Sequence, residues 1–341
     1  MAGSKAINQS YAKSGVDITA KNISNRLIGR VASTTYRPEV MSDVGFFSGM
    51  YDFKGYRQPV LVSSTDSVGT KIKIAIALDK YDTIGMDIVN HCVNDIFTGG
   101  ASPIFFLDYI GIGKLVPEKA ETIVRGVAEA CRDLNCVLIG GETAEMPDIY
   151  HDDDFDLAGF IVGVVEKDEI ITGKNITAGD AILGLPSSGL HTNGYTLARK
   201  VFGDSRPELQ KRYPEMDRPI GEVLLEPHRC YYNLLKPCLP MVKGLAHITG
   251  GGFGDNVPRI LPEGLAARFQ NLTWSVPPVF HLIQRLGGVD HDEMFRVFNM
   301  GIGMVIVCSP ENVSQFTRQL PEIKVIGEVT KQKDKDRVTI S

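Results

Sequence analysis

The sequence predicts an α/β or α+β protein of two domains, and three observations support this prediction. Its 341 residues exceed the usual size of one domain, which is about 150 residues. Apolar runs typical of strands alternate with longer helical patterns through both halves of the chain. A polar stretch at residues 166–174 interrupts this alternation. We therefore expect one domain over residues 1–170 and a second α/β domain over residues 171–341.

Local patterns define the elements of the first half. Apolar runs predict strands at residues 59–63, 104–110, 136–139 and 157–165. Helical patterns lie between and before them, at residues 23–32, 83–97 and 117–134. A proline at the first turn opens the last of these helices, where its missing amide hydrogen costs nothing.

The second half has the same mixed character. Apolar runs predict strands at residues 181–185, 265–269, 303–308 and 325–329. Helical patterns alternate with them at residues 195–202, 227–242 and 277–286. The chain shows no internal repeat and no low-complexity segment, so a solenoid or a disordered protein is not expected.

Composition and charge exclude several classes of protein. Hydrophobic residues make up 43% of the chain and charged residues 23%, as in an ordinary globular protein. The net charge of −5 and the lack of a Lys/Arg run argue against nucleic-acid binding. No apolar stretch reaches the ~20 residues of a membrane helix, and the first ten residues lack the apolar core of a signal peptide. Six scattered cysteines without a C-x-x-C pair favour buried, reduced thiols in a cytoplasmic protein over metal ligands.

Positive charge is missing from two long stretches of the first half. Residues 81–113 and 133–166 contain no Lys or Arg but several Asp and Glu. A solvated surface usually mixes both signs, so these stretches indicate a site that receives cations such as Mg²⁺. The alternative is that some of the acids are simply solvated, and this is the favoured interpretation for residues 152–154.

The predicted helix at residues 83–97 has one apolar and one polar arc. The polar arc carries only carboxylate, amide and imidazole groups, from Asp87, Asn90, His91, Asn94 and Asp95. Asp95 lies at the border of the apolar arc, where its side chain should be partly buried. We expect Asn94 and Asp95 to serve a metal or phosphate site, with a plain surface role as the alternative.

Two loops of the first half have the chemistry of a phosphate site. No G-x-x-x-x-G-K-[ST] or G-x-G-x-x-G motif is present, which disfavours a P-loop or Rossmann protein. The polar loop at residues 65–71 offers Asp66 for Mg²⁺ and Lys71 for a phosphate. The residues 140–143 follow a strand and offer free glycine amides beside the carboxylate of Glu142.

Two loops of the second half are candidates for binding a substrate. Residues 249–258 hold four glycines within five residues before a predicted helix start at Asn256 and Pro258, which favours phosphate binding over a flexible turn. Residues 186–195 place His191 among hydroxyl and amide groups in a strand-to-helix loop. His191 and His247 are equally compatible with catalytic and structural roles. The four other histidines outside the acidic helix, including His228, are interpreted as surface or structural residues.

Five segments in order carry a resemblance to a known family. They are Thr65-Asp66-Ser67-Val68-Gly69-Thr70-Lys71, Asn94-Asp95, Gly140-Gly141-Glu142-Thr143-Ala144-Glu145-Met146-Pro147, His191-Thr192-Asn193-Gly194-Tyr195 and His247-Ile248-Thr249-Gly250-Gly251-Gly252. Together they resemble the phosphoribosylformylglycinamidine cyclo-ligases of purine biosynthesis, also called aminoimidazole ribonucleotide synthetases. The resemblance runs from about residue 11 to residue 338, and the third and fifth segments are the most specific to these enzymes.

The resemblance implies a fold, partners and a reaction. It implies a homodimer whose N-terminal domains pair into a β-barrel, ATP bound near that interface, and a C-terminal α/β domain that closes over the substrate. The implied reaction is the ATP-dependent closure of formylglycinamidine ribonucleotide to 5-aminoimidazole ribonucleotide, with release of ADP and phosphate. ATP and Mg²⁺ are the implied cofactors.

The resemblance also implies roles for individual residues. ATP would be bound by Asp66, Thr70, Lys71, Asn94, Asp95, Gly140, Gly141, Glu142 and Thr143. Mg²⁺ would be held by Asp66, Asp95 and Glu142. The substrate would be bound by Ser187, Ser188, His191, Asn193, Gly250, Gly251 and Gly252. Catalytic roles fall to His191 or His247 for proton transfer and to Lys71 for charge neutralisation.

The chain departs from the family pattern at a few positions. Ser67 and Asp148 stand where glycine is usual, and Thr19 and Lys21 replace an aspartate and a glycine in the segment that covers the nucleotide. Lys21 would add a positive charge near the triphosphate. Two alternatives to the cyclo-ligase remain. Selenophosphate synthetase, a sister enzyme, is disfavoured because no cysteine precedes Cys92, and a regulatory nucleotide-binding protein is disfavoured because the acids and both histidines are retained.

Overall fold

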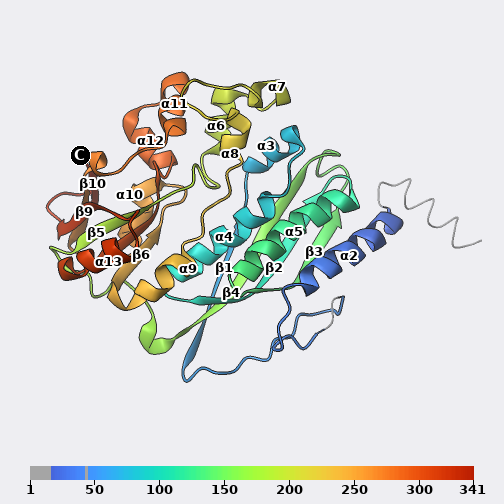
Figure 1. Cartoon of the computed structure of the whole chain (residues 1–341), viewed down its shortest axis with the longest axis horizontal. Helices are drawn as coiled ribbons and strands as arrows, with labels where there is room; N and C mark the ends of the chain where they lie inside the picture. Colours follow the sequence, from blue (N-terminus) through green and yellow to red (C-terminus); the bar gives the residue numbers. More distant parts are fainter. Residues whose placement is uncertain (1–16, 43–44) are drawn as a thin grey trace, which may run out of the picture.

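The computed structural model describes residues 17–42 and 45–341 and contains one sheet in each half of the chain (Figure 1). The first sheet has four strands in the order β1-β4-β2-β3, and the second has six in the order β10-β7-β9-β5-β8-β6. The predicted boundary at residue 170 lies in the segment that joins β4 to β5. The first ten residues and the start of the nucleotide-covering segment, at Gly15 and Val16, lie outside the described residues.

The strands of the first half bear out the predicted fold class. They are β1 (Pro59–Ser67), β2 (Ser102–Ile112), β3 (Val137–Glu145) and β4 (Phe155–Glu166). β4 pairs antiparallel with β1 and with β2, whereas β2 and β3 are parallel. Side chains of β1 alternate strictly between half-buried and exposed, because one face of this sheet is covered and the other is open.

Helices cover one face of the first sheet. They are α2 (Ile18–Ser33), α4 (Ile84–Phe97) and α5 (Pro117–Asp133), whereas α3 (Lys71–Leu78) packs against α7 and α8 of the second half. α4 packs on β1, β2 and β4 and against α5, while α2 lies beside α5 and β3 (Figure 1). The apolar arc predicted for α4 is confirmed, because Ile88, Cys92 and Val93 are fully buried. The uncovered face of the sheet leaves Leu61 64% and Phe160 44% exposed.

Two strands of the first half run further than the sequence indicated. β1 continues through Asp66, which therefore lies on a strand and not in a loop. β3 continues through Gly140–Gly141 to residue 145, so the expected end of the strand at residue 139 was wrong. The close packing of Gly141 explains this: a Cβ there would lie 2.3 Å from Oδ1 of Asp108 on the adjacent strand. Glycine is used here for close approach within a sheet.

The second sheet has mixed pairing. Its strands are β5 (Ala181–Pro186), β6 (Val242–His247), β7 (Leu265–Phe269), β8 (Ile302–Cys308), β9 (Lys324–Lys331) and β10 (Val338–Ile340). β10 is parallel to β7, and the other neighbours are antiparallel. β8 lies in the interior of this half, since all seven of its residues are buried.

The helices of the second half are short. They are α6 (Tyr195–Phe202), α7 (Arg206–Leu209), α8 (Ile220–Leu224), α9 (Tyr232–Leu235), α10 (Gly252–Asn256), α11 (Pro278–Gly287), α12 (His291–Val297) and α13 (Val313–Gln319). The long helix expected at residues 227–242 was wrong, because only α9 and a 3₁₀ turn (Lys236–Met241) form before β6 begins. Pro237 and Pro240 in this stretch remove backbone donors and disfavour a continuous α-helix.

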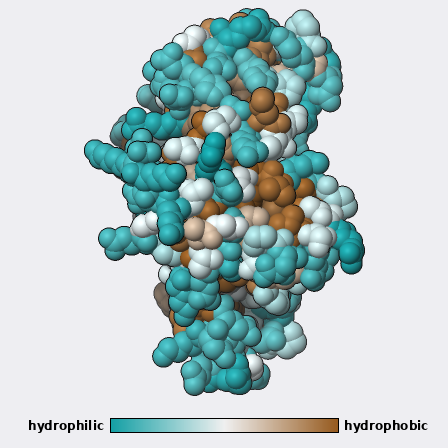
Figure 2. All heavy atoms as spheres, turned by 90° about the vertical axis from the view of Figure 1, so that its left-hand side faces the viewer, coloured by the Kyte–Doolittle hydropathy of each residue, from teal (hydrophilic) through white to brown (hydrophobic). Residues whose placement is uncertain are grey.

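The surface and the cysteines agree with the composition. Seen from the side of the second half, the surface is largely hydrophilic, with apolar side chains showing mainly near its middle (Figure 2). All six cysteines are free thiols, and all but Cys230 are buried. Among the described residues, no helix combines the length and the apolar character needed to cross a bilayer.

Candidate active site

The polar arc of α4 forms the junction between the two halves of the chain. The side-chain amide of Asn94 donates to the carbonyl of Arg229 at 2.8 Å and accepts from the amide of Tyr231 at 2.9 Å. Asn90 donates to the carbonyl of His228 at 2.7 Å. The buried side chain of Asn94 therefore binds backbone of the second half, and its metal or phosphate role stays a prediction.

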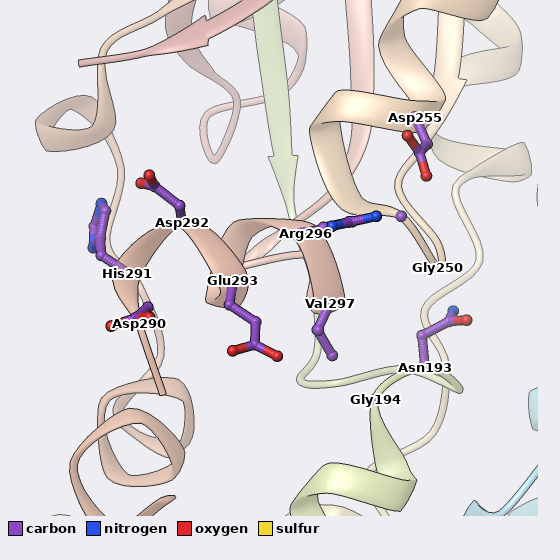
Figure 3. A pocket seen from close by; sticks show the side chains of 11 residues that line it. Asn193, Gly194, Gly250, Asp255, Asp290, His291, Asp292, Glu293, Arg296 and Val297 are labelled. Atoms are coloured by element: carbon purple, nitrogen blue, oxygen red, sulfur yellow. The ribbon is translucent and has the colours of Figure 1, made fainter. Parts of the chain in front are cut away.

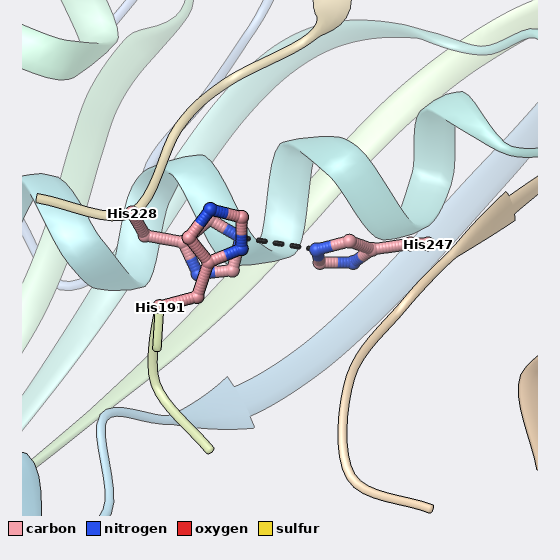
Figure 4. A group of neighbouring side chains, drawn as sticks. All are labelled: His191, His228 and His247. Atoms are coloured by element: carbon pink, nitrogen blue, oxygen red, sulfur yellow. Dashed lines mark hydrogen bonds between the residues drawn. The ribbon is translucent and has the colours of Figure 1, made fainter. Parts of the chain in front are cut away.

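Four histidines from both halves meet at this junction. His91 comes from α4, His191 from the loop after β5, His228 from the segment before α9, and His247 from the end of β6. The rings of His191 and His228 stack with centroids 4.0 Å apart, and Nε2 of His228 lies 3.0 Å from Nε2 of His247 (Figure 4). All four are buried, so His228 is not a surface residue, and its position in the cluster is compatible with the structural alternative.

Hydrogen bonds and one ion-pair contact link these side chains into a closed ring. Nδ1 of His91 lies 2.8 Å from Oγ1 of Thr192, which lies 3.4 Å from Nδ1 of His228. His228 contacts His247, whose Nδ1 lies 2.8 Å from Oδ1 of Asp95. Oδ2 of Asp95 returns to within 3.7 Å of Nε2 of His91. The ring crosses from one half to the other twice and so couples their positions.

Asp66 joins this ring from β1. Its Oδ2 lies 2.9 Å from Nε2 of His91, so Asp66 and Asp95 both lie within 4 Å of one nitrogen atom. The two side chains remain 39% and 29% exposed, whereas the histidines behind them are closed to solvent. The structure thus brings together the two carboxylates that the sequence singled out, at the solvent-facing edge of the junction.

Charge is concentrated at the Asp66 end of the ring. Burial lowers the pKa of His91, but the hydrogen bond that it makes to Asp66 and the charges of Asp95 and Asp66 outweigh burial and raise that pKa above its usual value. Burial acts to raise the pKa of both carboxyl groups, but hydrogen bonds and charge from His91 and His247 prevail and lower it. The charged form of His91 is therefore favoured beside two ionised carboxylates.

The remaining histidines are neutral. Burial lowers the pKa of His191 and of His228 well below the usual value, and nearby positive groups add to this effect. Burial also lowers the pKa of His247, although its hydrogen bond to Asp95 opposes the shift. Nε2 of His228 also lies 3.3 Å from the side-chain nitrogen of Asn94, and the donor and acceptor roles along the ring depend on the tautomers of its histidines. We call this chain of contacts the relay.

Lys71 does not face the junction opening. It is the first residue of α3 and is fully buried, with Nζ 2.8 Å from Oδ2 of Asp87 and 2.7 Å from the carbonyl of Glu226. Asp87 also accepts from the amide of His228. Burial lowers the pKa of Lys71 and raises that of Asp87. Lys71 thus forms a buried ion pair that ties α3, α4 and the second half together, while its phosphate contact and catalytic role stay predictions.

Glu142 lies at the opposite edge of the first sheet from Asp66. Asp66, Gly159, Asp108 and Gly141 form one row across β1, β4, β2 and β3. Three strand spacings of about 4.8 Å separate the ends of this row, roughly 14 Å. Glu142 also points to the other face, because it follows Gly141. The expectation that Glu142 joins Asp66 on one Mg²⁺ stays a prediction, and this geometry would require the two residues to come from different chains.

A cavity of about 850 Å³ lies beside β3 and α2. Among its lining residues are Lys21, Asp108 and the predicted ATP-binding residues Gly140, Gly141, Glu142 and Thr143. Nζ of Lys21 lies 4.0 Å from Oε1 of Glu142, and both side chains are half exposed. Burial raises the pKa of the Asp108 carboxyl group to about 7. Asp108 was not a candidate from sequence, where it is one aspartate within an apolar run.

A second cavity, of about 960 Å³, lies in the C-terminal half (Figure 3). It brings together three of the predicted substrate-binding residues, Asn193, Gly250 and Gly251. Arg296 and Asp255 also line it, and neither was noticed in the sequence because each is a single charge on a short helix.

Other predicted substrate residues do not reach this cavity. Ser187 and Ser188 bind Asn299 and the carbonyl of Pro227 within the protein. His191 is buried in the histidine cluster with a left-handed backbone (φ 63°), and its Nδ1 has no partner among the described residues. Gly252 donates its amide to the turn around it. Thr70 occupies the N-cap position of α3, and its hydroxyl lies 3.2 Å from the hydroxyl of Thr196 in the second half.

Comparison with known proteins identifies the family. Models of the AIR synthase related protein match the chain over residues 50–165 for the N-terminal domain and 177–339 for the C-terminal domain. The phosphoribosylformylglycinamidine cyclo-ligase of Geobacillus kaustophilus is 51% identical over 332 residues, which covers 95% of this chain and 96% of that protein. The chain belongs to the phosphoribosylformylglycinamidine cyclo-ligase family. The Desulfitobacterium hafniense cyclo-ligase is 49% identical over 95% of this chain and 98% of its own length.

Solved structures share the fold of this cyclo-ligase family member at low identity. Hydrogenase maturation protein HypE in complex with ATP superposes with a TM-score of 0.66 and 17% identity, covering 93% of this chain and 90% of that chain. Thiamine-monophosphate kinase from Stenotrophomonas maltophilia gives a TM-score of 0.64 at 14% identity, covering 92% of this chain and 95% of that chain. These likenesses support the fold alone.

Proposed function

We propose that this cyclo-ligase closes the imidazole ring of formylglycinamidine ribonucleotide at the expense of ATP, with the junction between its halves as the reaction site. The observation that carries the proposal is the pair Asp66 and Asp95, which share His91 at the solvent-facing edge of an otherwise buried relay. Full-length similarity to curated cyclo-ligases supports the reaction.

The reaction proceeds in two steps. The formyl oxygen of the substrate attacks the γ-phosphorus of ATP, ADP leaves, and an imidate phosphate forms. The ribosyl-bearing nitrogen of the amidine then attacks the formyl carbon, the bond from that carbon to the phosphate oxygen breaks, and the nitrogen loses its proton. The products are 5-aminoimidazole ribonucleotide, ADP and phosphate, so the original formyl oxygen leaves in the phosphate. Positioning and charge neutralisation supply most of the catalysis in phosphoryl transfer.

Asp66 and Asp95 would hold Mg²⁺. Carboxylate oxygens are the ligands that Mg²⁺ prefers, and both groups are ionised and partly open to solvent, so they fit this ion. When bound, the ion would neutralise the phosphate charge of ATP. His91 holds the two carboxylates together, and Ser64 supports Asp95 with a hydrogen bond of 3.3 Å.

The relay behind the carboxylates can accept the proton lost on ring closure. His247 is neutral, and its Nδ1 contacts Asp95 while its Nε2 is held by His228. We propose His247 as the residue that moves this proton, because it adjoins the carboxylate that faces the reaction. His191 is enclosed behind His228 and acts through stacking on it.

A homodimer would complete the nucleotide site. The open face of the first sheet exposes Leu61 and Phe160, as expected for a surface that a second copy covers, and we propose that two such sheets close into a barrel. Within a chain, Asp66 and the Gly140–Thr143 segment lie at opposite sheet edges, and a dimer would let these groups from different copies meet at one ATP. Leu61→Asp should then yield monomers in sedimentation analysis and lose ATP turnover.

One assay tests the proposed function. ADP release is measured with and without formylglycinamidine ribonucleotide, and the imidazole product is measured in parallel. The proposal predicts ADP release only with this substrate and one ADP for each product molecule. ADP release that is equally fast without the substrate, or formation of the imidazole product without ADP release, would refute the proposal.

A further inference from the structure

The cavity in the C-terminal half has one unpaired cation directed at a glycine turn. It lies between α12, the residues Asn193–Gly194 and the turn at Gly250–Gly251 (Figure 3). The side chain of Arg296 extends from α12 across the cavity toward Gly250 (Figure 3). In the part of the chain that the structure describes, Arg296 makes no ion pair and no hydrogen bond. A long cationic side chain held over a cavity without a partner is available for an anion.

The opposite wall of the cavity presents backbone donors. The side-chain amide of Asn256 donates to the carbonyls of Thr249 and Gly250, at 3.4 and 3.2 Å, from inside the protein. In a trans peptide the N–H points opposite to the C=O, so the amides of Gly250 and Gly251 point away from Asn256. Neither amide donates a hydrogen bond within the described chain.

The turn requires glycine for this arrangement. Gly251 has a left-handed backbone (φ +87°), and a Cβ there would lie 2.3 Å from Oδ2 of Asp255. Two free amides and one free guanidinium thus face the same space. A planar guanidinium and backbone amides together match the oxygens of a phosphate monoester.

The remaining charge of the cavity limits where an anion can bind. The described lining residues include one arginine and no lysine, with four carboxylates from Asp255, Asp290, Asp292 and Glu293. These carboxylates would repel a triphosphate that filled the cavity but leave room for one phosphate at the Arg296 end. They also offer acceptors for hydroxyl groups.

We propose that Arg296 binds the 5′-phosphate of the ribonucleotide substrate, together with the Gly250 and Gly251 amides, and thereby selects the phosphorylated substrate. This inference rests on the proposed function, because it takes formylglycinamidine ribonucleotide as the ligand. It makes Arg296 a specificity-determining residue about which the family motifs in the sequence say nothing.

The test compares Arg296→Gln with the control Arg285→Gln. The control removes an exposed arginine of α11 that pairs with Glu215. Each protein is titrated calorimetrically, without ATP, with formylglycinamidine ribonucleotide and with the riboside that lacks the phosphate. Wild type should bind the ribonucleotide far more tightly than the riboside. Arg296→Gln should lose about tenfold to a hundredfold in affinity for the ribonucleotide but none for the riboside, since a charged hydrogen-bond partner is lost.

The outcomes separate the two proposals. If Arg296→Gln binds the ribonucleotide within twofold of wild type, or loses affinity for both ligands equally, Arg296 does not bind the phosphate and the inference is overturned. If wild type binds the ribonucleotide through Arg296 but forms no product with ATP, the proposed function fails while the phosphate site stands. An ATP KM of Arg296→Gln equal to that of wild type would further support the assignment. An ATP KM raised as much as the KM for the ribonucleotide would overturn it.

Discussion

The buried pair of Lys71 and Asp87 provides a decisive perturbation. The sequence places Lys71 after a glycine turn, as in a phosphate-binding loop, whereas the structure encloses it completely. Lys71→Met removes the cation and keeps most of the volume. Asp87 then remains as an unpaired buried carboxylate beside the His228 amide. If Lys71 is structural, this variant loses stability; if it binds ATP, the variant loses nucleotide affinity.

The structure sets the size of the effect. Both side chains are fully buried and their charged atoms are 2.8 Å apart. Removing one member of such a pair typically costs about 3–5 kcal/mol, a large part of the ~5–15 kcal/mol stability of an ordinary domain. The double variant Lys71→Met/Asp87→Asn removes both charges, and its amide oxygen still accepts from His228. It should therefore recover most of the loss.

Urea unfolding and steady-state kinetics distinguish the two roles. We expect a much lower unfolding midpoint for Lys71→Met, recovery in the double variant, and an ATP KM within about threefold of wild type in the folded fraction of both. An unfolding free energy within about 1 kcal/mol of wild type, with an ATP KM raised tenfold or more, would refute the structural assignment.

Five further substitutions test other parts of the account. Asp66→Asn and Asp95→Asn should each weaken Mg·ATP binding in calorimetry with the fold intact, because each removes an anionic oxygen ligand. Lys21→Gly should reduce the salt dependence of the ATP KM, because exposed charges act over only ~10 Å at 0.1 M salt. Gly251→Val should raise the ribonucleotide KM at least tenfold and leave ATP affinity unchanged, because its Cβ would lie 2.3 Å from the carboxylate beneath it. Asp108→Asn should flatten the pH dependence of unfolding. Burial raises the pKa of that carboxyl group from 3.8 to about 7, so the folded protein keeps a proton that the unfolded chain releases, and stability falls by up to about 4 kcal/mol between about pH 4 and 7.

Each of these predictions has a contrary result. Unchanged Mg·ATP affinity in both aspartate variants would reject the metal assignment. Equal salt dependence of the ATP KM in Lys21→Gly and wild type would leave Lys21 as a surface residue. Loss of ATP binding with intact ribonucleotide binding in Gly251→Val would reverse the roles of the two halves. If the unfolding free energy of Asp108→Asn depends on pH as strongly as that of wild type, another group causes this dependence.

Local patterns explain how much of the fold the sequence could predict. The apolar arc of α4 follows from 3.6-residue periodicity, and its members are buried as expected. The boundaries of β7 and α6 are also as predicted, since strong apolar or amphipathic runs end there at turn residues. The end of β3 was predicted too early, at Gly140–Gly141, because glycine usually breaks a strand. Here glycine allows β3 to pass close to Asp108.

The candidate site was only partly predictable because its partners are distant in sequence. Asp66 and Asp95 carried chemical signals of their own and meet as expected. His228 lacks any motif spacing, and its place in the relay comes from packing against His91, more than a hundred residues earlier in the chain. Lys71 carried a misleading signal, because a lysine after a glycine turn has the same pattern whether its amine meets a phosphate or a buried carboxylate.

Isotope transfer tests the central claim most directly. The substrate is prepared with ¹⁸O in its formyl group and is turned over by the enzyme with unlabelled ATP in unlabelled water. The account predicts that the label appears in the released phosphate, one ¹⁸O for each imidazole product, because ATP phosphorylates the formyl oxygen before the ring closes. Label found in water, with unlabelled phosphate, would contradict the account.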